Sequence, residues 1–307
     1  MELTPLRYFV RAADRENFTK AAAELRVSQP ALSRAVAGLE AELGRPLFER
    51  EGRRVRLTDA GRTFRDRAAK VIALADDAAA EVADDGATGT VRLAAIPTVA
   101  PFLLPSVLAA FAKEKPAATV RVTEDVTAEC VRRLRTGETD LAVLALPVPD
   151  PTLAAEPLYD EPLLAALPPT HRLAGAGRVS ADELRAEPFV LLGEAHCLSA
   201  TVESFCRRSG AAPLAVERTS QLATVTALVA AGHGVSLVPA AAATDPRVAY
   251  RPLTPPAPSR TVACAWNPDR YASKLTRALL AVLRAAEPPG GPPVTPDSAR
   301  PARGPTV

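Results

Sequence analysis

The segment from Asn17 to Gly61 constrains the fold of this chain more than any other, because it holds two helical patterns separated by only three residues. Apolar side chains recur at helical spacing in a short stripe and then in a longer one: Phe18, Ala22 and Leu25, followed by Leu32, Val36, Leu39 and Leu43. The intervening Arg26-Val27-Ser28 leaves room only for a tight turn, with Ser28 placed to cap the second helix and Pro30 tolerated in its first turn. The pattern predicts a helix-turn-helix.

The second helix presents small and polar residues beside its apolar stripe: Gln29, Pro30, Ser33, Arg34 and Ala37. Such a face enters a major groove without steric obstruction, where the Arg34 guanidinium suits guanine and the Gln29 amide suits adenine. The alternative is a pair of surface helices in an ordinary helical domain, although a generic exposed face would be richer in Glu and Lys.

Residues 45–70 predict a basic wing that follows the second helix. Gly52 lies between two short segments whose apolar residues suggest strands, like the tip of a β-hairpin. The same stretch holds nine Lys or Arg against four Asp or Glu, a local charge of +5, whereas the whole chain carries only +2. Because phosphate affinity depends on local charge, we expect this region to hold the DNA backbone.

The motifs of this region resemble those of the LysR-type transcriptional regulators. They are Ala21-Ala22-x-x-Leu25, Ser28-Gln29-Pro30-Ala31-Leu32-Ser33, Leu39-Glu40, Leu43-Gly44-x-x-Leu47-Phe48-x-Arg50 and Leu57-Thr58-x-Ala60-Gly61. The resemblance implies a DNA-binding regulator of promoters, either an activator that contacts RNA polymerase or a repressor. It also implies base contacts from Gln29, Pro30, Ser33 and Arg34, and backbone contacts from Arg50, Arg53 and Arg54.

A long helix from about Asp59 to Val82, capped by Thr58, is predicted to pair two subunits. Apolar residues recur along it with the alternating four and three spacing of a heptad repeat: Phe64, Ala68, Val71, Ala75, Ala78 and Val82. This seam buries little area because it is rich in alanine, so we expect support from the rest of the subunit. A dimer would place two recognition helices on successive turns of DNA, and LysR-type regulators often assemble further into tetramers. The alternative is that the helix packs only on its own head domain.

From Thr90 onward, short β-branched runs alternate with helical stretches, which predicts two α/β lobes with largely parallel sheets. The LysR resemblance implies a two-lobed effector domain like that of periplasmic solute-binding proteins. We therefore divide the chain into a winged helix-turn-helix at 1–58, a linker helix and hinge at 59–89, an effector domain at 90–286 and a tail. One lobe takes 90–160 and 270–286, and the other takes 161–269. The tail at 287–307 is dominated by Pro and Gly, so we predict that it is disordered.

Several classes of function are disfavoured by what the sequence lacks. The start Met1-Glu-Leu-Thr-Pro-Leu6 has neither a basic region nor an apolar core, and no apolar run approaches the roughly twenty residues that span a bilayer, so we expect a cytoplasmic protein without a membrane partner. The chain has no glycine-rich phosphate loop, no C-x-x-C pair and only three histidines. We expect no cofactor, no metal and no enzymatic activity.

Two of the four cysteines, Cys197 and Cys206, suggest a switch. If Leu198 to Arg207 is helical, nine residues separate their Cα atoms by roughly 13 Å, whereas a disulfide needs about 7 Å or less. Oxidation would therefore have to refold the segment. Cys197 would lie at a helix N-terminus beside His196, conditions that favour the reactive thiolate. Cys130 and Cys264 are more typical of core residues.

A narrower resemblance, to the OxyR peroxide sensors of the LysR family, rests on His196-Cys197-Leu198 with Cys206 nine residues on, together with Ile96-Pro97-Thr98-Val99-x-Pro101-x-Leu103-Leu104-Pro105 and Thr127. It implies a response to oxidative stress in which Cys197 is the peroxidatic thiol and Cys206 the resolving one. Thr98, Thr127 and His196 would hold the peroxide. The chain departs from the subgroup at Ser199-Ala200-Thr201, where Arg-Asp-Gln is usual. The arginine expected near the final helix is met by Asn267, with Arg270 as a substitute.

An alternative effector stays open at this point. The same cleft, lined by Thr98, Thr127, His196 and Thr201, would instead bind a small anionic metabolite through hydroxyls and helix N-termini, with no redox role for the cysteines.

Overall fold

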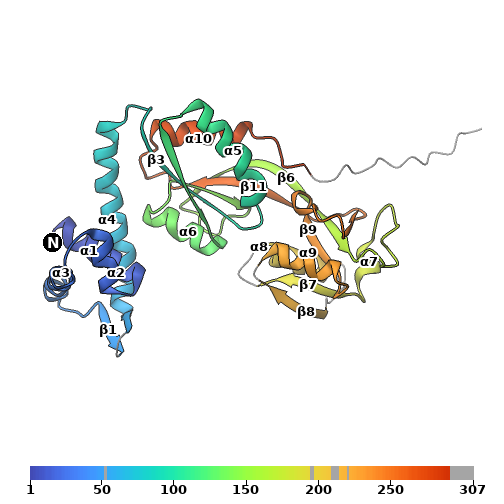
Figure 1. Cartoon of the computed structure of the whole chain (residues 1–307), viewed down its shortest axis with the longest axis horizontal. Helices are drawn as coiled ribbons and strands as arrows, with labels where there is room; N and C mark the ends of the chain where they lie inside the picture. Colours follow the sequence, from blue (N-terminus) through green and yellow to red (C-terminus); the bar gives the residue numbers. More distant parts are fainter. Residues whose placement is uncertain (52–53, 194–196, 209–213, 220, 291–307) are drawn as a thin grey trace, which may run out of the picture.

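The computed structural model describes residues 1–51, 54–193, 197–208, 214–219 and 221–290. A small helical head, a long helix and two α/β lobes follow one another along the molecule, and the first lobe lies between the head and the second lobe (Figure 1). No helix among these residues is long and apolar enough to cross a membrane.

The head contains three helices and a two-stranded antiparallel hairpin: α1 (Leu3–Arg15), α2 (Phe18–Leu25), α3 (Gln29–Leu43), β1 (Phe48–Glu51) and β2 (Arg54–Leu57). The predicted helix-turn-helix and hairpin are confirmed, and α1 is an addition. Phe9 of α1 is fully buried and packs its ring against Phe48 and Phe64, so the first helix forms the floor of the head's core. Edge-to-face and tilted ring pairs of this kind stabilise a core beyond their buried area.

The long helix α4 (Asp59–Ala83) begins where the sequence predicts. The Thr58 hydroxyl accepts a hydrogen bond from the Gly61 backbone N–H at 2.9 Å and caps it. A Cβ at Gly61 would lie 2.0 Å from the Leu47 carbonyl oxygen, so only glycine allows the helix to pass this close to the preceding loop. The Thr58-x-Ala60-Gly61 motif thus fixes the direction in which α4 leaves the head.

The first lobe is a sheet covered by helices. Its elements are β3 (Gly89–Ala95), α5 (Ala100–Glu114), β4 (Ala118–Glu124), α6 (Thr127–Thr136), β5 (Leu141–Ala145), β11 (Ser259–Trp266) and α10 (Lys274–Ala285). Strands β4 and β5 flank β3 and run parallel to it, while β11 joins antiparallel to β5. One continuous core of Val, Leu and Ala side chains holds these elements together.

The second lobe is built around the far half of a long strand. Its elements are β6 (Ala154–Leu167), α7 (Ala181–Leu184), β7 (Pro188–Leu192), α8 (Cys197–Arg208), β8 (Leu214–Thr219), α9 (Leu222–Ala230), β9 (Ser236–Pro239), the 3-10 turn Ala240–Ala242 and β10 (Ala249–Pro252). Residues 154–162 of β6 pair with β11, and residues 163–167 pair with β9 and β10. The strand therefore runs from one lobe into the other.

Three expectations need correction. The pairings of β6, β9, β10 and β11 are antiparallel, so the sheets are mixed rather than largely parallel. Strand β11 belongs to the first lobe, because Val262, Cys264 and Ala265 are buried in that lobe's core. The final helix begins at Lys274 with Ser273 as its cap, four residues later than predicted, because Asn267 to Arg270 form a turn that contacts α4.

Candidate nucleic-acid interface and candidate sensing site

The recognition helix α3 exposes the residues that the sequence analysis selected. Ser28 accepts a hydrogen bond from the Ala31 N–H at 3.3 Å, so the helix begins at Gln29. The side chains of Gln29, Pro30 and Arg34 are exposed, and Ser33 is half-buried. The Gln29 Nε2 donates to the Ser33 hydroxyl at 2.8 Å, which orients the amide on the helix surface. This face is open to a partner along the first two turns of α3.

The wing is tied to α3 by backbone contacts. The Glu40 carboxylate accepts hydrogen bonds from the backbone N–H groups of Leu47 and Phe48 at 2.7 and 3.1 Å, and the Thr58 hydroxyl donates to the Pro46 carbonyl at 2.8 Å. These contacts explain why Glu40, Leu47-Phe48 and Thr58 recur together in the motif. Figure 1 shows the hairpin at the lower end of the head, beside the start of α4.

Two of the predicted backbone-binding arginines, Arg50 and Arg54, lie in the strands of this hairpin. Arg50 pairs with Val55 across the two strands, and Arg54 is the first residue of β2. Arg53 lies outside the described residues.

The predicted dimer seam on α4 is only partly available. Ala68 is 2% exposed in the head's own core, so it cannot face a second subunit, which corrects that part of the prediction. Phe64 is half-buried and packs its ring against Phe9. Further along, Val71, Leu74 and Val82 are 48%, 55% and 90% exposed. Ala78 is exposed as well, and Ala75 is half-buried. An apolar stripe of Val71, Leu74, Ala78 and Val82 therefore remains uncovered in this chain, and Leu74 was absent from the predicted seam.

A buried ion pair lies beside Thr98. Arg260 and Glu161 face each other across the β6–β11 pairing and are each 4% exposed. The Arg260 guanidinium donates to the Glu161 carboxylate at 2.7 and 2.8 Å, to the Thr98 hydroxyl at 2.6 Å and to the Thr98 carbonyl at 2.9 Å. The second Glu161 oxygen accepts from the Ala241 N–H at 3.1 Å. Charged partners thus join Thr98 to the crossing strands and to the second lobe.

Arg260 is a residue that the sequence analysis missed. It sought an arginine near Asn267 or Arg270, but Arg270 pairs with Asp77 of α4 instead. The available signal was a single charged residue directly before the apolar run Thr261–Trp266, a position typical of a strand that enters a core.

Thr127 begins α6, and its hydroxyl is buried without a hydrogen-bond partner among the described residues. An orphaned buried hydroxyl of this kind is expected to have a partner of some sort, such as a small ligand or water. Thr201 is half-buried on α8. His196 lies outside the described residues, so the predicted group of four cannot be placed as a whole.

The two switch cysteines share one helix. α8 starts at Cys197 and contains Cys206 as its tenth residue, so the predicted helical state of this segment is confirmed. At 1.5 Å per residue, nine residues separate the two Cα atoms by about 13 Å. Leu198, Val202 and Phe205 are buried and hold the helix on the second lobe's core. The Ser199 hydroxyl donates to the carbonyls of Leu192 and Gly193 at 2.6 and 3.0 Å and ties the start of α8 to the end of β7.

The other two cysteines are fully buried. Burial raises the pKa of the Cys130 thiol and of the Cys264 thiol to about 12. Both therefore stay protonated at neutral pH, which disfavours attack on an oxidant.

A cleft of about 750 Å³ lies between the lobes. Its lining includes Pro97, Phe102, Val126 and Leu222, with carboxylates from Glu124 and Asp125. Thr98 and Thr127 adjoin lining residues rather than line the cleft themselves, and no basic residue belongs to the described lining. The two carboxylates disfavour an anion beside them, while the backbone N–H groups at the start of α9, which also lines the cleft, are donors of the kind that the alternative hypothesis invokes.

The winged head and the two-lobed domain define a transcription regulator with an effector domain. The model of the bacterial regulatory helix-turn-helix protein, lysR family, matches residues 3–62, and that of the LysR substrate binding domain matches residues 84–288. The chain belongs to the LysR family.

Relatives and solved structures agree with this assignment. A "Probable hydrogen peroxide-inducible genes activator" from Mycobacterium avium is 42% identical over 264 residues, which are 84% of this chain and 85% of the relative. A full-length OxyR variant from Pseudomonas aeruginosa is 32% identical with a TM-score of 0.77, covering 94% of this chain and 99% of that one. An H2O2-bound OxyR variant from Corynebacterium glutamicum is 32% identical with a TM-score of 0.61, covering 92% and 93%.

Proposed function

We propose that this chain is a peroxide-responsive regulator that binds promoter DNA in the cytoplasm and changes state when Cys197 and Cys206 form a disulfide. The observation that carries the proposal is the placement of both cysteines in α8, nine residues apart. A disulfide holds its Cα atoms within about 7 Å, so it is incompatible with the helix. The peroxide-inducible activators and the H2O2-bound structure among the relatives support the same assignment.

The chemistry needs only the two thiols and peroxide. The Cys197 thiolate attacks one peroxide oxygen, the O–O bond breaks, and hydroxide leaves and takes up a proton as water. Cys206, as a thiolate, then attacks the sulfenic sulfur, forms the S–S bond and expels the second oxygen as hydroxide, which takes up a proton and leaves as water. Cys197 is the first residue of α8, and the N-terminus of a helix favours negative charge of the kind that the attacking thiolate carries.

The groups that would hold peroxide are the Thr98 hydroxyl, the Thr127 hydroxyl, His196 and Thr201, to which we add Arg260. The buried Thr127 hydroxyl, which has no hydrogen-bond partner in the part of the chain that the structure describes, supports this role, because hydrogen peroxide both donates and accepts hydrogen bonds. Arg260 supports it through its contact with the Thr98 hydroxyl, because a hydroxyl that accepts from a guanidinium keeps its own proton to donate.

For DNA, we propose that α3 reads bases with Gln29, Pro30, Ser33 and Arg34 while Arg50, Arg53 and Arg54 hold phosphates. We also propose a dimer, with further assembly to a tetramer, through the exposed stripe of α4, because four apolar side chains on one helix face are otherwise left in water. RNA polymerase is the further partner if the protein activates transcription.

Peptide mapping of thiol state tests the switch. Wild-type protein treated with a mild peroxide pulse should yield a Cys197–Cys206 peptide pair, and Cys197→Ser should lose both the pair and the change in operator binding. Cys264→Ser serves as the matched control, since its thiol is buried in the first lobe. Wild-type protein that stays reduced while it still regulates its promoter would contradict the redox role and favour a small-molecule effector.

Gel-shift titration tests the reading helix. Arg34→Ala should weaken specific operator binding by about 1–3 kcal/mol, which is roughly 5- to 150-fold. Arg121→Ala, an exposed arginine on β4 of the first lobe, is the control and should bind like wild type. Equal affinity of the two variants would refute the assignment of α3.

A further inference from the structure

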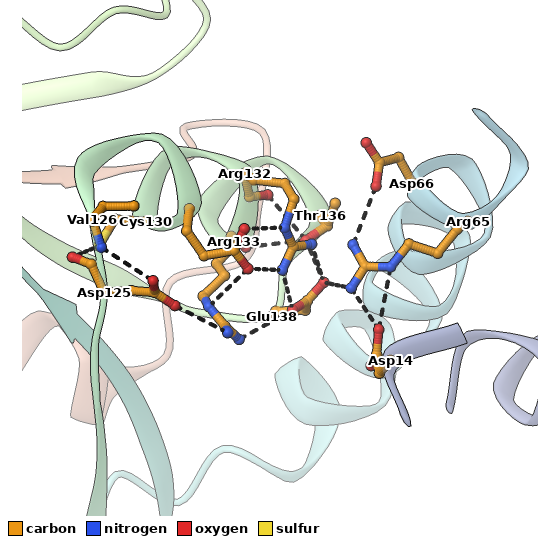
Figure 2. A network of polar contacts seen from close by, with 11 residues as sticks. Asp14, Arg65, Asp66, Asp125, Val126, Cys130, Arg132, Arg133, Thr136 and Glu138 are labelled. Carbon is orange, nitrogen blue, oxygen red and sulfur yellow. Dashed lines mark hydrogen bonds and ion pairs between the residues drawn. The ribbon is translucent and has the colours of Figure 1, made fainter. Parts of the chain in front are cut away.

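A shared network of charged side chains connects the regulatory domain with the DNA-binding head (Figure 2). Arg65 of α4 lies at its centre and is 13% exposed. Its guanidinium contacts Asp14 of α1 at 2.6 Å and Glu138, directly after α6, at 3.0 Å. One side chain of the linker helix therefore bridges the head and the first lobe.

Glu138 is held firmly on the regulatory side. Its carboxylate accepts hydrogen bonds from Arg132 at 2.6 and 2.8 Å and from the Thr136 hydroxyl at 3.0 Å. Burial acts to raise the pKa of Glu138, but the hydrogen bond from Arg132 and the charge of Arg65 outweigh it and lower the pKa to about 2. The carboxylate is thus charged at every physiological pH.

The opposite end of α6 lies at the inter-lobe cleft. Asp125 and Val126, which line the cleft, immediately precede the helix, and Thr127 is its first residue. Arg133 ties the two ends together, because it contacts Asp125 at 3.3 Å and Glu138 at 3.3 Å. α6 has ten residues and spans about 15 Å from the cleft to the network.

The residue that follows α6 packs tightly against the linker helix α4. Gly137 adopts a left-handed conformation with φ +72°, and a Cβ placed there would lie 2.5 Å from the Ala73 Cβ of α4 and 1.6 Å from Arg270 Nη1. The backbone after α6 therefore rests directly on the linker helix. A displacement of α6 has to move α4 or break the network, because close-packed contacts transmit small shifts rather than absorb them.

We propose that α6 is a rigid connector between the cleft and the head, and that the Arg65–Glu138 contact transmits a conformational change of the regulatory domain to the DNA-binding helices. Isolated surface ion pairs contribute little, but Glu138 here contacts Arg65, Arg132 and Arg133. Glu129 contacts two of these arginines, and all of these side chains are 13–30% exposed, so the geometry of the network is restrained. The inference rests on the proposed function only in taking peroxide as the signal.

The first test compares reduced and peroxide-treated protein by DNase footprinting and gel shift. Glu138→Gln keeps the shape of the side chain and removes its charge. Glu156→Gln removes a carboxylate that pairs with Arg284 of α10 rather than with a residue of the head or α4, and serves as control. Glu138→Gln should form the disulfide like wild type while the ratio of oxidised to reduced operator affinity falls at least threefold toward one. A wild-type response in this variant would overturn the proposal.

A second measurement is made without peroxide. In reduced protein, Glu138→Gln should increase backbone hydrogen exchange several-fold in residues 63–77 of α4 and 131–138, whereas Glu156→Gln should not. If Glu138→Gln does not fold, Arg65→Gln breaks the same contact from the linker side and should give the same two results. Unchanged exchange in both variants would overturn the connector, whereas a wild-type protein that shows no peroxide response would overturn only the proposed signal.

Discussion

Replacement of Arg260 by methionine is the most informative perturbation of the sensing site, because it leaves Glu161 buried without its cation. Glu161 is 4% exposed, and after the change its described partner is the Ala241 N–H at 3.1 Å. The Thr98 hydroxyl and carbonyl lose their charged donor at the same time. Methionine fills much of the volume of the arginine stem, so the effect isolates the charge rather than a cavity.

The expected loss of stability follows from the cost of an unpaired buried charge. Removing one partner of a buried pair typically costs about 3–5 kcal/mol, whereas an apolar replacement of both partners is often near neutral. We therefore expect Arg260→Met to lower the free energy of unfolding by about 3–5 kcal/mol. The double variant Arg260→Met with Glu161→Gln should recover about 1–3 kcal/mol of that loss, since no charge then remains buried.

Urea unfolding of the full-length protein at pH 7, followed by tryptophan fluorescence and circular dichroism, measures the difference. Arg284→Met is the control, because its pair with Glu156 is 50% and 35% exposed and should contribute less than about 1 kcal/mol. A loss below about 1 kcal/mol for Arg260→Met, or a double variant less stable than the single one, would refute the reasoning.

Three further predictions concern other parts of the chain. Val71→Asp, on the exposed stripe of α4, should shift the protein toward monomer in sedimentation velocity, whereas a wild-type profile would place the subunit contact elsewhere. Gly137→Ala should lower the melting temperature, since it combines a strained left-handed residue with overlap on Ala73, at a cost of about 1–3 kcal/mol; a melting temperature equal to wild type would contradict the close packing. Because the folded pKa of Glu138 is about 2, below its ordinary value of 4.5, its stabilisation is present above pH 4.5 and is lost as pH falls toward 2. The stability gap between wild type and Glu138→Gln should therefore be about 2 kcal/mol at pH 7 and shrink steadily in urea titrations below pH 4.5, and a gap that does not change with pH would contradict this.

Local patterns in the sequence predicted the head and the linker well. Ser28 and Thr58 cap their helices as expected, because capping depends only on neighbouring residues. The helix α1 was missed although its signal is present: Leu6, Phe9 and Ala13 recur at helical spacing and are buried. The bounds of α5, α6 and β7 also follow their apolar periodicity closely.

Contacts between residues far apart in the chain could not be predicted from the sequence. Glu161 and Arg260 are 99 residues apart, and nothing in either neighbourhood indicates the other. Strand β6 was missed because its first half is exposed on alternate residues and carries Pro157, Asp160 and Glu161, which obscures the apolar run that follows. The predicted stripe on α4 contained Ala75, whereas the exposed stripe contains Leu74. Periodicity alone does not say which side of a helix is covered by its own domain.

The return of β11 and α10 to the first lobe has a consequence for synthesis on the ribosome. Residues 259–285 complete a sheet and a core whose other parts lie at 89–162, so this lobe stays unfinished until nearly the whole polypeptide has emerged. The second lobe's strands and helices, all encoded earlier, can collapse before it. A released fragment that ends at residue 255 should accordingly protect residues 163–252 from protease while leaving 89–145 open to cleavage.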